Sequence, residues 1–145
     1  MALILVGKEM SNNKTTNNEV FTPEWYIKTL DEKFNCINGP IIDNCCGGGA
    51  WLKYAQDKGC EVWGCDLEES NCIETIKNLY GAGNVEVLKG NNIPEEFKGP
   101  GLIAVFKHNG NVINNIVQAD SLEYRMNFNS KAKPETFGNG LFEVE

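Results

Sequence analysis

The sequence predicts an α/β fold. Strand-like and helix-like segments alternate over residues 41–80, with a spacing typical of parallel strands joined by helical crossovers. A glycine turn at 47–49 directly follows the first of these strands, which is where α/β sheets place ligands. The segments at 84–88, 101–107 and 114–124 are β-rich. We expect one domain of 145 residues with a mostly parallel sheet and a β-rich C-terminal part.

Residues 1–21 are expected to form a flexible N-terminal arm. Its opening, MALILV, is typical of a short strand, and the rest is polar and rich in Asn. A helix is expected to start with Thr22 as its N-cap and Pro23 in its first turn, where the missing N–H costs nothing. The Asn-Gly-Pro sequence at 38–40 ends this helical region.

Four alternating elements follow this break. The pattern predicts a strand at 41–43, a helix at 50–58, a strand at 61–65 and a helix at 68–80. Gly59 and Gly81 stand where the two helices should end.

Composition and charge disfavour the binding of nucleic acid by this chain alone, although a partner subunit or a small local patch could supply it. The net charge is −7, from 13 basic and 20 acidic residues, whereas a domain that binds nucleic acid by itself usually has a basic face. No stretch approaches the roughly 20 apolar residues that span a bilayer. We expect a cytoplasmic protein with no membrane partner.

The cysteines suggest either metal or redox chemistry, or simple burial as small apolar side chains. They are Cys36, Cys45, Cys46, Cys60, Cys65 and Cys72. No Cys-x-x-Cys pair occurs, and the one histidine, His108, is remote in sequence. Adjacent cysteines cannot easily form a disulfide with each other. We therefore favour burial and expect no metal ligands.

The glycine turn carries the clearest chemical signal. Asp43 precedes Gly47 and Gly49, and Asp66 ends the next strand, where a carboxylate can accept from both hydroxyls of a ribose. Leu52 occupies the place of the third glycine in a pyrophosphate-binding turn, and no P-loop lysine follows. These residues favour a nucleoside without a phosphate chain, and S-adenosylmethionine fits. The alternative is a tight loop without a ligand.

Four segments resemble a known family in their order. EVFTPEWYIKTLDEKF, IIDNCCGGGAWL, WGCDLEES and NIVQADSLEY are similar to motifs of S-adenosylmethionine-dependent amino-methyltransferases that act on DNA adenine. The resemblance covers 19–70 and 114–128. It implies a Rossmann-like methyltransferase fold, in a truncated form.

The resemblance also implies which residues bind the cofactor. They are Phe21, Thr22, Pro23, Asp43, Gly47, Gly49, Trp51, Asp66, Leu67, Asp120, Ser121 and Leu122. By analogy, Asp43 and the turn hold the methionine portion, with Trp51 in the aromatic position. Asp66 would bind the ribose, Leu67 would pack on the adenine, and Asp120 would accept from the adenine amino group.

Three departures from the family pattern limit what it implies. Asn44 replaces a proline, and residues 85–110 form an insertion before the third cofactor motif. The family's catalytic signature, Asp/Asn-Pro-Pro-Tyr/Phe, does not occur in the 145 residues. Asn139 and Phe142, in GNGLF, are weak candidates for its role.

These observations leave three hypotheses. The first is a small, phage-like DNA adenine methyltransferase, or one part of a split enzyme of a restriction-modification kind, that touches DNA through a partner subunit. The second is a catalytically degenerate module that binds S-adenosylmethionine as a sensor, a sequestering protein or a regulatory subunit. The third is an enzyme that cleaves the cofactor. For each we expect a homo-oligomer or a hetero-complex, since a short sheet leaves an exposed edge.

Overall fold

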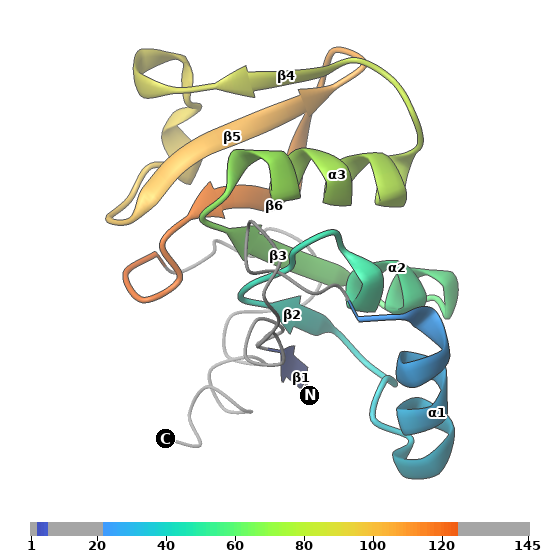
Figure 1. Ribbon diagram of the computed structural model, residues 1–145. Coiled ribbons are helices and arrows are strands. Elements are labelled where there is room, and N and C mark those ends of the chain that lie inside the picture. Colours follow the sequence, from blue (N-terminus) through green and yellow to red (C-terminus); the bar gives the residue numbers. More distant parts are fainter. Residues whose placement is uncertain (1–2, 6–21, 125–145) are drawn as a thin grey trace, which may run out of the picture.

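A six-stranded sheet forms the centre of the molecule (Figure 1). The computed structural model describes the backbone of residues 3–5 and all of residues 22–124. In chain order the strands are β1 (Leu3–Leu5), β2 (Ile41–Asp43), β3 (Val62–Asp66), β4 (Val85–Leu88), β5 (Leu102–His108) and β6 (Asn111–Ala119). Across the sheet their order is β1-β2-β3-β6-β5-β4. The predicted α/β class is confirmed.

The sheet is mixed, so the prediction of a mostly parallel sheet is wrong. The pairs β1–β2, β2–β3 and β3–β6 are parallel, whereas the pairs β6–β5 and β5–β4 are antiparallel. A two-residue turn at Asn109-Gly110 reverses the chain between β5 and β6, with φ of 50° and 87°. These positive angles belong to the hairpin turn that Asn-Gly favours. The expected insertion at 85–110 therefore supplies the antiparallel part of the sheet.

The strand expected in MALILV is present as β1, which pairs with β2. Leu3–Leu5 thus belongs to the sheet. The remaining residues of that arm lie outside the described part.

Three helices connect the strands and match the expected segments closely. They are α1 (Glu24–Phe34), α2 (Ala50–Asp57) and α3 (Glu69–Tyr80). Pro23, and not Thr22, is the N-cap of α1, because its extended backbone lets its carbonyl accept from the N–H groups of Tyr26 and Ile27. None of the helices in the described ranges is long and apolar enough to cross a membrane.

Helices α2 and α3 cover one face of the sheet (Figure 1). Leu52 and Ala55 of α2 and Ile76 of α3 join Phe106 and Ile116 of the strands in one buried cluster. Gly64 of β3 lets α2 come close, since a Cβ there would lie 2.6 Å from Leu52 Cδ1. A single methyl group at Gly64 would therefore force the Leu52 side chain to shift.

A second cluster lies under the connection between β4 and β5. That connection contains η2 (Gly90–Asn92) and η3 (Glu95–Phe97). Phe97 packs with Val105, Val117 and Tyr124, and the Tyr124 hydroxyl donates to the Phe97 carbonyl at 3.0 Å. The expected insertion therefore also covers part of the sheet.

A buried carboxylate fastens α1 to α2. Asp31 Oδ1 accepts from the Ile37 N–H at 2.8 Å, and Oδ2 accepts from the Tyr54 hydroxyl at 2.9 Å and the Lys58 ammonium at 2.6 Å. Burial acts to raise the pKa of Asp31, but the bonds from Lys58, Ile37 and Tyr54 favour the charged form and lower the pKa overall. The network therefore holds α1, which precedes β2, against α2, which follows the glycine turn.

Candidate cofactor site at the glycine turn

Three acidic residues meet at one edge of the sheet. Asp43 ends β2, Asp66 ends β3, and Asp120 directly follows β6. The three strands are parallel, so their carboxyl ends share this edge, which faces the left side of Figure 1. Sequence reasoning placed Asp43 and Asp66 at strand ends and Asp120 within a β-rich segment, and the structure brings all three to this edge.

The turn between β2 and α2 is built on glycine. Gly47 and Gly49 have φ of 54° and 89°, which side-chain-bearing residues rarely adopt. A Cβ on Gly49 would lie 2.9 Å from Thr75 Cγ2, so this position needs glycine for space as well. The turn therefore follows a tight path that only small residues allow.

Strand β3 holds the turn from one side. The Cys46 N–H donates to the Cys65 carbonyl at 3.0 Å, and the Gly47 N–H donates to Asp66 Oδ2 at 2.9 Å. Two residues expected to share a ligand, Gly47 and Asp66, are thus in direct contact.

Helix α3 holds the turn from the other side. Thr75 Oγ1 donates to the Gly47 carbonyl at 2.8 Å, and Asn78 Nδ2 donates to the Gly48 carbonyl at 2.7 Å. Sequence reasoning missed both residues. Thr75 is fully buried between the apolar positions Cys72 and Ile76, and a polar residue within an apolar stripe was the signal that could have found it.

The Asp66 carboxylate is buried and largely engaged. Besides the Gly47 N–H, it accepts from the Glu68 N–H at 2.9 Å and from Asn71 Nδ2 at 3.3 Å, both through Oδ1. A carboxylate offers about four acceptor positions, so about one is left for a ligand hydroxyl. Asp43 is equally buried, and its Oδ1 accepts from the Cys45 N–H at 3.1 Å.

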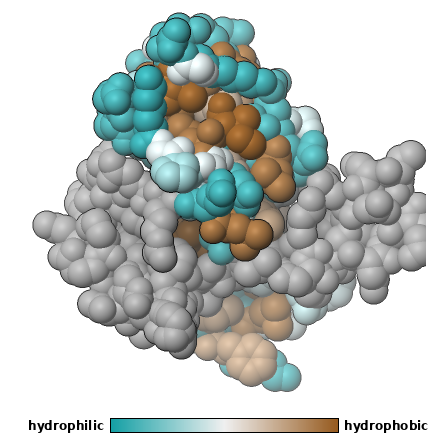
Figure 2. Space-filling view, turned by 90° about the vertical axis from the view of Figure 1, so that its left-hand side faces the viewer, coloured by the Kyte–Doolittle hydropathy of each residue, from teal (hydrophilic) through white to brown (hydrophobic). Residues whose placement is uncertain are grey.

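Apolar side chains are exposed beside the acids. Leu67 is 57% exposed and Leu122 is 93% exposed, although both are large and apolar. The Gln118 amide donates to the Leu67 carbonyl at 2.8 Å, and Asp120 Oδ1 accepts from the Leu122 N–H at 3.0 Å. Figure 2 views the molecule from this side and shows apolar surface among polar residues.

Some of the remaining expected residues lie within the described part of the chain, and the others lie outside it. Trp51, in the first turn of α2, is half-buried and packs against the main core cluster. Ser121 is half-buried in the loop after β6, and Thr22 and Pro23 precede α1. Within residues 22–124, neither Thr22 nor Pro23 hydrogen-bonds to the turn. Phe21, Asn139 and Phe142 lie outside the described residues.

Three cysteines near the turn are buried thiols. Burial raises the pKa of Cys65 to about 12, and it also raises the pKa values of Cys46 and Cys72 well above the ordinary value. A thiol that stays protonated is a poor nucleophile and metal ligand. In the described ranges, no group of His, Cys, Asp or Glu side chains is arranged to hold a metal ion.

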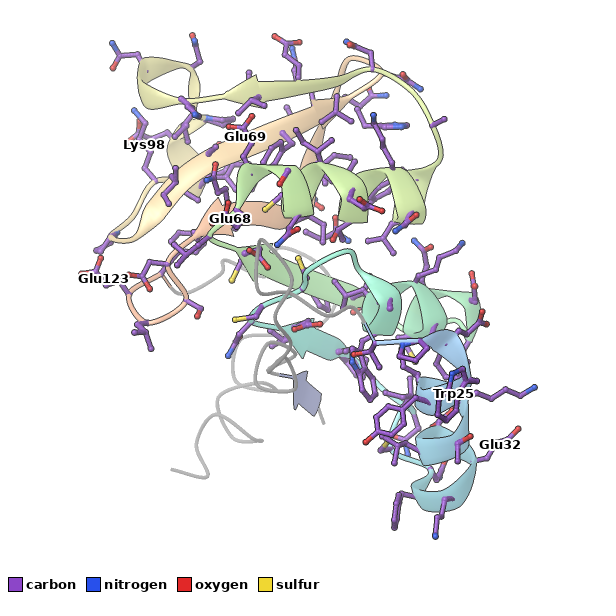
Figure 3. The ribbon with its side chains drawn as sticks, viewed as in Figure 1. Trp25, Glu32, Glu68, Glu69, Lys98 and Glu123 are labelled. Atoms are coloured by element: carbon purple, nitrogen blue, oxygen red, sulfur yellow. The ribbon has the colours of Figure 1, made fainter. Side chains whose placement is uncertain are left out.

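The edge around the site is acidic. Glu68 and Glu69 lie at the start of α3, and Glu123 lies in the loop after β6, as Figure 3 labels. Glu69 pairs with Lys89 at 3.2 Å, whereas Glu68 and Glu123 are exposed. A nucleic-acid backbone would be repelled by this edge.

A cavity of about 230 Å³ lies elsewhere, near the amino end of β3. Its lining includes Tyr80 and Asn115. The Tyr80 hydroxyl donates to Asn115 Oδ1 at 2.7 Å, and Asn115 Nδ2 donates to the Val62 carbonyl at 2.9 Å. These polar groups hydrogen-bond to one another. They are therefore less available to a ligand than the polar groups of the glycine turn.

Comparison with protein-family models, curated proteins and solved structures finds no match for this chain.

Proposed function

We propose that the chain binds S-adenosylmethionine at the glycine turn, within a Rossmann-like methyltransferase fold. The observation that carries the proposal is the joining of Gly47 to Asp66 at the edge that also holds Asp43 and Asp120. A nucleoside site needs a glycine turn between two strands that each end in an acidic residue.

The residues present fit this cofactor better than a dinucleotide. Three carboxylates at one edge attract the positive sulfonium and amino groups and repel a pyrophosphate. Asp66 keeps about one acceptor position for a ribose hydroxyl. Leu67 and Leu122 offer apolar surface for the adenine, and Asp120 has a second carboxylate oxygen for its amino group.

The bound cofactor would supply an activated methyl group, and the chain's residues would bind and orient it. Asp43, together with the turn, would hold the amino-acid end. Asp66 would fix the ribose, and the leucines would exclude water from the adenine. Positioning of this kind is the main protein contribution to methyl transfer.

The first candidate activity is methylation of adenine in DNA, with a partner subunit completing the site. The ordered motifs of the sequence support it, and Asn139 and Phe142 are its candidate catalytic residues. The test uses methyl-labelled cofactor and adenine-containing DNA, with the chain alone and with the proteins that co-purify with it. Label in the DNA supports the activity, and its absence in both arms contradicts it.

The second candidate is a module that binds the cofactor without transferring its methyl group. The exposed carboxylates of Glu68 and Glu123 favour it, because they oppose the approach of DNA to this edge. Tight binding with no transfer in the same assay would support this candidate over the first.

Equilibrium dialysis with labelled S-adenosylmethionine tests the binding that both candidates share. We expect saturable binding that S-adenosylhomocysteine displaces and that ATP does not, because ATP carries a phosphate chain. Displacement by ATP, or no saturable binding, would contradict the proposal.

Light scattering on the same sample tests whether the chain forms the expected oligomer through its outer strands, β1 and β4.

A further inference from the structure

The backbone N–H groups of the glycine turn differ in whether they donate a hydrogen bond. The N–H groups of Cys45, Cys46, Gly47 and Gly49 donate to Asp43 Oδ1, the Cys65 carbonyl, Asp66 Oδ2 and the Cys46 carbonyl, respectively. Within the described residues, the Gly48 N–H donates to no other group. Gly48 is half-buried, so part of this residue is accessible to a ligand.

The direction of the Gly48 N–H follows from the bonds to α3. The described peptide bonds are all trans, and in a trans peptide the C=O and the N–H point in opposite directions. Thr75 draws the Gly47 carbonyl toward α3 at 2.8 Å, so the Gly48 N–H of the same peptide points away from α3. Asn78 likewise draws the Gly48 carbonyl, and the Gly49 N–H then points to the Cys46 carbonyl at 2.8 Å.

We propose that Thr75 and Asn78 are positioning residues of the cofactor site, which orient the turn so that the Gly48 N–H donates to a carboxylate of the ligand. The inference rests on the proposed binding of S-adenosylmethionine, whose amino-acid end carries such a carboxylate. Without the Thr75 bond, no hydrogen bond within the described residues would hold the Gly47–Gly48 peptide, and without the Asn78 bond only the Gly49 N–H would hold the Gly48–Gly49 peptide. Helix α3 therefore sets the ligand-facing side of the turn without touching the ligand.

A purely structural role for Thr75 predicts different results from a positioning role. Thr75→Val keeps the shape of the side chain and removes the donor, whereas Thr75→Ser keeps the hydroxyl. Tyr80→Phe is the matched control, because it removes a hydroxyl bond from the same helix to Asn115 at 2.7 Å, far from the turn. Asn78 is exposed, so Asn78→Ala tests the second bond without opening the core.

The experiment records amide NMR spectra of the ¹⁵N-labelled full chain, first alone and then during titration with S-adenosylmethionine. In Thr75→Val we expect shifted Gly48 and Gly49 amide resonances and about 3–10-fold weaker binding, as for one lost hydrogen bond. Asn78→Ala should move the Gly49 resonance. Thr75→Ser should restore both the resonances and the affinity, and Tyr80→Phe should change neither.

Unchanged glycine resonances in Thr75→Val and Asn78→Ala would overturn the inference, with or without ligand. So would shifted resonances with an affinity equal to that of Tyr80→Phe. If the wild-type chain does not bind S-adenosylmethionine, the proposed function fails together with the ligand part of the inference. The spectra without ligand still decide whether Thr75 and Asn78 orient the turn.

Discussion

The Gly47 N–H donates to Asp66 Oδ2 at 2.9 Å, across 19 positions of the sequence. The bond joins the turn after β2 to the end of β3, the two places where a nucleoside cofactor would be held. Since Asp66 also accepts from the Glu68 N–H and from Asn71, one buried carboxylate organises both the turn and the start of α3. The candidate site is thus ordered by its own hydrogen bonds before any ligand arrives.

Asp66→Ala should therefore destabilise the fold as well as the site. Three donors lose their acceptor, and we expect the free energy of unfolding to fall by about 2–3 kcal/mol. Urea denaturation followed by circular dichroism measures it. Asp57→Ala is the control, because Asp57 is exposed and, among residues 22–124, pairs only with Lys53 on the surface of α2, so its loss should be within about 0.5 kcal/mol. Equal midpoints for the two variants would contradict the role of Asp66.

Gly49→Ala and Gly59→Ala separate strain from steric conflict. Both glycines have similar positive φ, 89° and 92°, so each alanine should cost about 1 kcal/mol of backbone strain. A Cβ at Gly59 meets nothing within 4 Å, whereas one at Gly49 lies 2.9 Å from Thr75 Cγ2. We expect a larger loss of stability in Gly49→Ala, and weaker cofactor binding in that variant alone. Equal losses would mean that the turn can move away from Thr75.

The Asp31 network should make stability depend on acid pH. Its pKa in the folded state is below the ordinary value of 3.8, so its contribution is present above that value and is lost as pH falls through the lower, folded pKa. Asp31→Asn should cost about 1–3 kcal/mol at pH 7. The difference between wild type and variant should shrink when unfolding is measured from pH 5 down to pH 2.5. A difference that stays constant over this range would contradict the assignment.

The cysteines should react with thiol reagents in two classes. Cys46, Cys65 and Cys72 are buried with raised pKa values, and at pH 8 a pKa of about 12 leaves Cys65 ionised in about one molecule in ten thousand. Cys36, Cys45 and Cys60 are partly exposed and should react first. Iodoacetamide labelling mapped by mass spectrometry, with and without denaturant, distinguishes the classes. Rapid labelling of Cys46 or Cys65 in the native chain would reopen redox or metal chemistry.

The order and type of the elements were predictable where hydrophobic periodicity and glycine punctuation agree. The strand before Gly47 and the helices ended by Gly59 and Gly81 lie within a residue or two of their expected bounds. The prediction of a mostly parallel sheet rested on the strand–helix alternation over 41–80 and did not use Asn109-Gly110, a strong local hairpin signal.

The acidic residues and glycines of the candidate site were predictable from the sequence, but the residues that hydrogen-bond to the turn from α3 were not. Asp43, Gly47 and Asp66 stand out because each occupies a special place in a strand or a turn. Thr75 and Asn78 act through carbonyl groups of residues about 30 positions away, and only the packing of α3 on the turn brings them there. Thr75 leaves one local signal, a polar residue within the apolar stripe of α3, but that signal does not identify the distant carbonyl group that it reaches.

Calorimetric titration of the wild-type chain and Asp66→Ala with S-adenosylmethionine tests the central claim most directly. Each sample is first shown to be folded at the titration temperature, and Asp57→Ala serves as the control. We predict one site per chain in wild type and in Asp57→Ala, and binding weaker by about 1–3 kcal/mol in Asp66→Ala, because a ribose hydroxyl loses its acceptor. No binding heat with the wild-type chain, or equal affinity in Asp66→Ala, would contradict the account.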